Sequence, residues 1–330
     1  MSRSVRSLFA ALSILTATPA LAATPTEPAP YATLAALEAR VAAIGFRLTT
    51  ANAAWCPSVQ PQLGWLWGDL RLYGAPDRAG ARATYQASDA DAPFIAAIAP
   101  GSPAAAAGLT VGAAILAING IPLSAQPDGD PFARITALET RLGTLPPDAA
   151  IDIATSNDRT VSVTPIAGCA SDFRVEDRKQ VAGVADGRLV LINAGLASFA
   201  ADDNELAAAV AHELAHNILR HRARLDAAGV DRGLGKQFGR SARLFRQTEV
   251  EADRLSVWLM HGAGYDMGAA PRFWRAYGKQ GGPVLFQAGT HPRWQARVES
   301  VEAEIAAIRS AEAAGAPLAP PLINAPPPLE

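Results

Sequence analysis

The segment "ELAAAVAHELAHNILRH", residues 205–221, decides how the C-terminal half of the chain folds. It places three of the five histidines in an otherwise alanine-rich run that reads as a buried helix. Two imidazoles and a carboxylate are costly to bury unless a partner compensates them. A bound metal ion would satisfy His212, Glu213 and His216 at the same time.

The spacing within this helix supports a metal site. Asp202, followed three residues later by Glu205, predicts the start of the helix. His212 and His216 are four residues apart, so they lie about 40° apart around the axis, one turn above the other, and reach one ion at zinc distances. Glu213 lies about 60° from His216, which suits a general base better than a ligand. This is the HExxH arrangement of a metallopeptidase.

A catalytic zinc site takes a third protein ligand and leaves the fourth position for water. The segment "RQTEVEADRLSVWLMHGAGYD", residues 246–266, predicts a second helix that could supply it. We assign Glu249 as the third ligand, and Asp253, four residues on, as the acceptor that orients a ligand imidazole. The alternative is an acidic, solvated face. We expect Glu251 to lie on such a face and His221 to be solvated.

The motifs "HELAHNILRH" and "EVEAD" together resemble the gluzincin metalloendopeptidases related to the CAAX prenyl protease and the heat-shock membrane protease. The resemblance covers roughly residues 171–312 and is strongest to the soluble periplasmic type, represented by the beta-barrel assembly-enhancing protease. It implies one zinc ion per chain, bound by His212, His216 and Glu249, with Glu213 as the general base.

The same family commonly has a Thr-His-Pro segment further on, and "THPRWQAR", residues 290–297, matches it. His291 and Arg297 are therefore candidate catalytic residues that stabilise the oxyanion. The alternative is a loop histidine and a surface arginine. The strand "RLVLINAG", residues 188–195, is where we expect an extended substrate to pair.

Residues 99–123, "APGSPAAAAGLTVGAAILAINGIPL", resemble the PDZ domains of exported bacterial proteases, within a unit of roughly 82–167. Ser102 before a proline predicts a helix start, and Asn119 before a glycine predicts a tight turn. Ala113 stands where the family usually has Asp, and no carboxylate-binding glycine loop is evident. Two functions of the PDZ-like domain therefore stay open: it binds a peptide or protein partner, or it is only a spacer that positions the protease domain.

The N-terminus predicts export. Residues 1–22 have two arginines, an apolar stretch and a small-residue cleavage pattern, which is typical of a secretory signal peptide; an uncleaved anchor helix is the alternative. No interior run is apolar enough for a membrane span, so we expect no transmembrane segment in the mature chain. Cys56 and Cys169 are the two cysteines, and an oxidising compartment such as the periplasm allows them to pair. Two unrelated buried thiols are the alternative.

A chain of 330 residues with 49% hydrophobic residues is long enough for two modest domains. Its formal net charge of −2 argues against a nucleic-acid-binding protein. We predict an α+β chain: a mainly helical zincin-type metalloprotease domain with a small edge sheet, preceded by a PDZ-like β domain. The expected segments are a signal peptide (1–22), an N-terminal helical segment (23–81), the PDZ-like domain (82–167), the metalloprotease domain (168–312) and a disordered proline-rich tail (313–330).

The predicted function is that of an exported zinc metalloendopeptidase that hydrolyses unfolded or misassembled polypeptides in envelope quality control. A zinc-stabilised chaperone or adaptor that binds clients through the PDZ-like domain is the alternative from another class. A third reading is an interaction module that acts chiefly through the PDZ sheet edge.

Overall fold

The computed structural model describes residues 31–89, 91–123, 130–156, 159–230, 239–280 and 292–330. In these residues the helices are α1 (Ala32–Ala51), α2 (Arg78–Tyr85), α3 (Pro103–Ala106), α4 (Pro131–Gly143), α5 (Ala194–Phe199), α6 (Asp203–Ile218), α7 (His221–Ala227), α8 (Gly239–Gly262), α9 (Ala269–Gln280), α10 (Trp294–Ala313) and α11 (Pro321–Asn324), with 3-10 turns η1 (Ala53–Trp55) and η2 (Leu70–Leu72). The strands are β1 (Val59–Gln62), β2 (Trp65–Gly68), β3 (Phe94–Ile98), β4 (Ile115–Ile118), β5 (Ile121–Pro122), β6 (Ile151–Thr155), β7 (Arg159–Val163), β8 (Ile166–Cys169), β9 (Asp172–Glu176), β10 (Gly183–Ala185) and β11 (Leu189–Asn193). The α+β class is as predicted.

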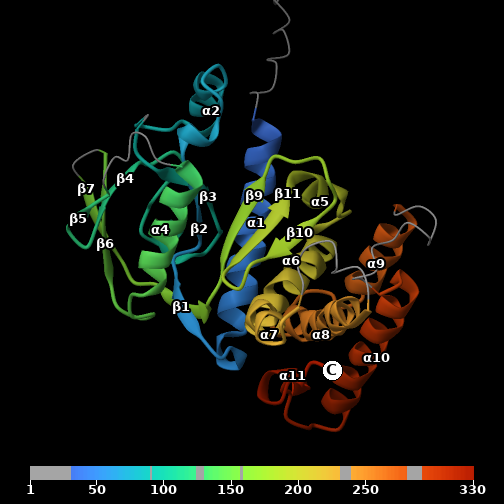
Figure 1. Cartoon of the computed structure of the whole chain (residues 1–330). Helices are drawn as coiled ribbons and strands as arrows, with labels where there is room; N and C mark the ends of the chain where they lie inside the picture. Colours follow the sequence, from blue (N-terminus) through green and yellow to red (C-terminus); the bar gives the residue numbers. More distant parts are fainter. Residues whose placement is uncertain (1–30, 90, 124–129, 157–158, 231–238, 281–291) are drawn as a thin grey trace, which may run out of the picture.

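Figure 1 shows a PDZ-like unit on one side and a helical unit on the other, with α1 running between them. In the PDZ-like unit, β5, β4, β6 and β7 form an antiparallel sheet in that order, and β2 pairs with β3. The Ser102 hydroxyl accepts from the amide of Ala105 at the start of α3, at 3.3 Å. Asn119 and Gly120, at φ 50° and 72°, form the tight turn between β4 and β5. Both local features follow the sequence pattern.

The PDZ-like unit begins earlier than residue 82, where the sequence placed its boundary. Leu63, Trp65 and Trp67 are buried in the same apolar core as Ile95 on β3 and Ile135 on α4. This core therefore takes its first strand from the segment that we expected to be a separate helical region. A short aromatic run does not reveal which sheet it joins, so the boundary could not be set from the sequence.

Helix α1 belongs to the core of the helical unit. Its residues Val41 and Leu48 are fully buried, in one cluster with Val210 of α6. It also contacts α2, where the Tyr85 hydroxyl donates to the Glu38 carboxylate at 2.7 Å. Burial raises the pKa of Glu38 to about 7, and the hydrogen bond from Tyr85 offsets only part of that effect.

The helical unit carries a three-stranded sheet in the order β10-β11-β9. β11 pairs antiparallel with β10 and parallel with β9. The prediction that a substrate strand pairs with residues 188–195 was wrong, because both edges of β11 are already occupied. In the residues that the structure describes, β10 and β9 are the outer strands of this sheet, and β10 lies beside α6.

The start of α6 is capped as the sequence predicts. The Asp202 carboxylate accepts from the amide of Glu205 at 2.9 Å, and the Glu205 carboxylate accepts from the amide of Ala201 at 3.1 Å. These two reciprocal hydrogen bonds satisfy donors that a helix end otherwise leaves open. The cap fixes where α6 begins and hence the depth at which its histidines sit.

The prediction of a disordered tail over residues 313–330 was wrong. It contains α11, whose Leu322 is buried in the core of the helical unit. Beyond it, Arg224 donates to the carbonyl of Pro327 at 2.6 Å, and Gln247 donates to the carbonyl of Pro328 at 2.8 Å. Prolines keep their carbonyl acceptors, so a proline-rich segment can dock on side-chain donors, which composition alone does not reveal.

The two chain connections of the PDZ-like unit lie side by side. Cys56 and Cys169 form a disulfide across 113 residues, with their Cα atoms 5.3 Å apart. β1 pairs antiparallel with β8 immediately inside it.

None of the helices in the described part of the chain is long and apolar enough to cross a membrane. The predicted signal peptide lies outside the described residues.

Candidate metal centre

Three side chains converge between α6 and α8. His212 and His216 come from α6, and Glu249 comes from α8. The two Nε2 atoms are 3.2 Å apart, and they lie 3.4 Å and 3.5 Å from the oxygens of Glu249. Tetrahedral zinc with bonds of about 2.0–2.1 Å requires ligand atoms about 3.3 Å apart. The donor set and its spacing therefore fit a zinc ion.

The far nitrogen of His212 is held by a buried ion pair. Its Nδ1 lies 3.0 Å from Oδ1 of Asp253, which is fully buried. Arg297 donates to both oxygens of Asp253, at 2.6 Å and 2.8 Å, and stacks on the ring of Trp274. Burial favours protonated Asp253, but Arg297 and His212 together outweigh it and lower the pKa of Asp253. The carboxylate thus stays ionised and orients His212, as the sequence suggested.

Arg297 lies where it can position Asp253. The sequence resemblance made it a candidate for oxyanion stabilisation, but its guanidinium is directed at Asp253 and is only 5% exposed. Its Nη2 is also 3.9 Å from Glu249. The Asp253 pair uses Nε and Nη2 of Arg297, and Arg297 also lines the cavity, so its contact with the oxyanion stays a prediction. His291, the other candidate, lies outside the described residues.

The far nitrogen of His216 is held by a second chain of contacts. Its Nδ1 is 2.8 Å from Nδ1 of His221, whose Nε2 is 3.1 Å from the Glu251 carboxylate. Arg224 donates to the same carboxylate at 2.5 Å. The expectation that His221 and Glu251 are solvated was wrong, because they are only 2% and 3% exposed.

The backbone explains this error. α6 ends at Ile218, and Arg220 takes a left-handed conformation with φ 53°. The chain turns there, and His221 begins α7 facing back toward His216. A continuous helix would have directed His221 about 140° away from His216. The sequence showed a third histidine close to the motif, but its contact with His216 could not be predicted without knowing that the helix turns at Arg220.

Burial sets different protonation states within the site. Burial alone would lower the pKa of His212, but hydrogen bonds to Asp253 and Glu249 raise it to about 9. For His216, burial dominates and lowers the pKa. For Glu213, burial raises the pKa to about 7. A carboxyl group that titrates near neutrality is suited to both accept and donate a proton.

Glu213 faces a cavity of about 470 Å³ that also exposes the three ligands. The cavity is bordered by β10 and by Trp274 and Tyr277 of α9. Gly183 of β10 packs directly against the Glu213 carboxyl: a Cβ at this position would lie 2.9 Å from the Glu213 Oε1. Sequence reasoning missed these three residues, because no motif marks them. The cavity brings together a base, a metal-ligand set and an open strand edge.

The comparisons with known proteins agree with this geometry. Residues 180–234 match the model of peptidase family M48. This match includes β10, β11 and α6, and ends before Glu249, which the fold brings to the site. Residues 94–133 match a PDZ domain.

A curated relative is the mitochondrial metalloendopeptidase OMA1 of Schizosaccharomyces pombe, 29% identical over 150 residues, or 39% of this chain and 44% of that protein. The chain therefore spans less than half the length of this relative. Together with the family match, it supports a metalloprotease, a hydrolase that acts on peptide bonds.

Proposed function

We propose that this chain is an exported zinc metalloendopeptidase that cleaves unfolded or misassembled polypeptides in the cell envelope. The observation that carries the proposal is the convergence of His212, His216 and Glu249 beside the Glu213 carboxyl, in one cavity bordered by a strand edge. The similarity to peptidase family M48 and to a metalloendopeptidase supports the same reaction.

The residues divide the reaction between them. Zinc, when bound, supplies a Lewis acid that polarises the scissile carbonyl and makes water more acidic. Glu213 accepts the proton of the attacking water and later gives it to the departing amine. Asp253 and His221 fix the outer nitrogens of the two imidazoles, so the inner nitrogens stay directed at one point.

The open edge of β10 supports a preference for extended substrates. A peptide that adds a strand to this edge would lie along the cavity, beside Glu213. Val184, in the middle of β10, is 58% exposed. Recognition through backbone hydrogen bonds requires an extended chain more than a particular side chain, which suits unfolded polypeptides.

Two features support export to an oxidising compartment. The N-terminal 22 residues have the pattern of a signal peptide. The disulfide between Cys56 and Cys169 is of the kind that persists in secreted and periplasmic proteins and is rare in the cytosol. Quality control in the envelope is the biological role that we infer from these features and from the substrate edge.

The test compares the wild-type protein with Glu213→Gln for bound zinc and for cleavage of unfolded casein. We expect equal zinc content and loss of cleavage in the variant. His261→Gln serves as a control, because His261 lies at the end of α8 beside Glu312. Equal cleavage by the wild type and Glu213→Gln overturns the proposal, and binding of casein without cleavage by either protein favours the chaperone alternative.

A further inference from the structure

The unpaired edge of β2 is the natural acceptor site of the PDZ-like unit. In the described residues β2 pairs with β3 alone, and PDZ-type sheets bind partners by adding a strand to such an edge. The space beside β2 is a cavity of only about 40 Å³, bordered by Trp65 and Trp67 of β2 and by Leu142 of α4. Gln60–Gly64, Glu139 and Ser171–Phe173 from the start of β9 complete its lining. A segment of the helical unit thus lies where an added strand would.

Two glutamines of β1 hydrogen-bond to the segment at the start of β9, mainly through its backbone carbonyls. Gln60 donates to the carbonyl of Ser171 at 3.0 Å and to the Asp172 carboxylate at 3.1 Å. Gln62 donates to the carbonyls of Cys169 and Ser171, at 3.1 Å and 3.2 Å. Both glutamines are buried. Amide donors that satisfy main-chain carbonyls recognise an extended segment by its backbone, as strand addition does.

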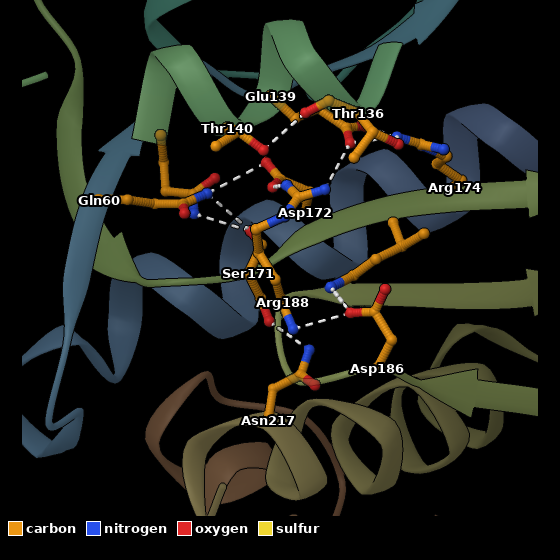
Figure 2. A network of polar contacts seen from close by, with 12 residues as sticks. Gln60, Thr136, Glu139, Thr140, Ser171, Asp172, Arg174, Asp186, Arg188 and Asn217 are labelled. Carbon is orange, nitrogen blue, oxygen red and sulfur yellow. Dashed lines mark hydrogen bonds and ion pairs between the residues drawn. The ribbon is translucent and has the colours of Figure 1, made fainter. Parts of the chain in front are cut away.

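An ion cluster holds α4 against the same segment. Glu139 of α4, 3% exposed, accepts from Nε of Arg174 at 2.9 Å and from Nη2 of Arg188 at 3.2 Å. Arg174 also donates to the Thr136 hydroxyl at 2.9 Å, and Arg188 pairs with Asp172. Figure 2 shows these side chains converging from α4 and from the sheet of the helical unit. Removal of one partner from such a buried cluster leaves uncompensated charge.

The network continues to the metal-binding helix. Asn217 of α6 donates to the Ser171 hydroxyl at 2.7 Å (Figure 2). It also accepts from the amide of Gly187 at 2.8 Å. Asn217 directly follows the ligand His216. The segment that closes the groove therefore contacts both the PDZ-like unit and the helix that supplies two metal ligands.

We propose that the PDZ-like unit has an internal ligand: Ser171–Arg174 occupies the groove between β2 and α4, Glu139 clamps it there, and an external peptide gains the β2 edge only when this segment leaves. The proposal goes beyond the peptidase reaction and does not depend on it. It explains why the groove is nearly filled although the unit has a PDZ fold.

Hydrogen–deuterium exchange of the full chain tests the proposal without any readout of cleavage. Glu139→Arg places a third positive charge beside Arg174 and Arg188. We expect amide exchange in residues 60–68 and 171–176 to become at least about tenfold faster, since about 1.4 kcal/mol of lost contact already corresponds to tenfold. Exchange in α8, which does not belong to this network, serves as the internal measure that the fold persists.

Two further variants separate the clamp from general destabilisation. Ala137→Arg introduces the same side chain at an exposed position of α4, a charge change of +1 against +2 for Glu139→Arg, and is expected to leave exchange at the wild-type rate. Arg174→Glu added to Glu139→Arg restores an opposite-charge pair and is expected to recover most of the protection. Should Glu139→Arg fail to fold, the double variant Gln60→Ala and Gln62→Ala applies the same test. The proposal is overturned if exchange is unchanged in the variant that remains folded, either Glu139→Arg or the double glutamine variant. It is also overturned if Ala137→Arg accelerates exchange in the same residues as much as Glu139→Arg does.

Discussion

Replacement of His221 by phenylalanine tests whether the buried contact behind the metal site sets metal affinity. In the wild-type protein, His221 lies 2.8 Å from Nδ1 of His216 and fixes the direction of its ligand nitrogen. Phenylalanine has a similar shape but no hydrogen-bonding group. The fold is expected to persist, because Glu251 keeps its contacts with Arg224 at 2.5 Å and with Gln247 at 3.0 Å.

The magnitude follows from the role of such outer contacts. Loss of the group that orients a metal-ligating histidine typically weakens metal binding by about 10–100-fold, or roughly 1.4–2.7 kcal/mol. We expect His221→Phe to fall in this range, since His216 is one of three ligands and burial leaves no bulk water to replace the partner. Glu251→Gln, one contact further out, is expected to have a smaller effect of the same sign.

The assay is competition for zinc against a chelator of known affinity, with thermal unfolding of the metal-free proteins measured in parallel. His261→Phe is the matched control, because this histidine is on α8 and its imidazole contacts Glu312 at 3.5 Å. If His221→Phe binds zinc as tightly as the wild type while remaining folded, the contact has no orienting function and the reasoning is refuted.

Other features of the structure lead to further expectations. Gly183→Ala places a Cβ 2.9 Å from the Glu213 Oε1, so casein cleavage should fall by up to about 100-fold while zinc content stays unchanged; full activity would show that the base tolerates displacement. Glu38 has a pKa of about 7 in the folded protein, above its ordinary value of 4.5, so the folded state binds the extra proton and the free energy of unfolding falls as pH rises from 4.5 through 7. Glu38→Gln should remove this dependence, with a gain of roughly 3 kcal/mol at pH 8 and little at pH 4, measured by urea denaturation; an equal effect at both pH values would contradict the assignment. Replacement of Cys56 and Cys169 by serine opens a loop of 113 residues and should lower the free energy of unfolding by roughly 5 kcal/mol in the chain-entropy estimate, whereas an unchanged urea midpoint would show that the bond is not formed in solution.

The sequence was most informative where a short pattern has one local solution. The Asp202 and Glu205 cap, the four-residue spacing of His212 and His216, and the turn at Asn119 all depend on neighbours within a few residues. Such patterns are decided by helix and turn geometry, which the chain carries with it into any fold.

It was least informative where tertiary packing decides the outcome. Whether His221 faces solvent or His216 depends on one left-handed residue, Arg220, at the end of a helix. Likewise, the sequence of β11 does not show that this strand lies between two others; the pairing with both neighbours leaves β10 and β9 as the outer strands in the described part of the chain. Trp65 joins the PDZ-like core through pairing with a strand far along the chain. Long-range partners of this kind leave no periodic trace in the sequence.

The disulfide between Cys56 and Cys169 gives the PDZ-like unit an unusual form of attachment. The unit is a loop whose two ends are joined covalently at its base. A protease that nicks the backbone anywhere between these cysteines would leave a molecule that migrates as one species until a thiol reductant is added. Each half of a cleaved insert would remain anchored beside the metal-binding unit, so damage by neighbouring proteases need not separate the two.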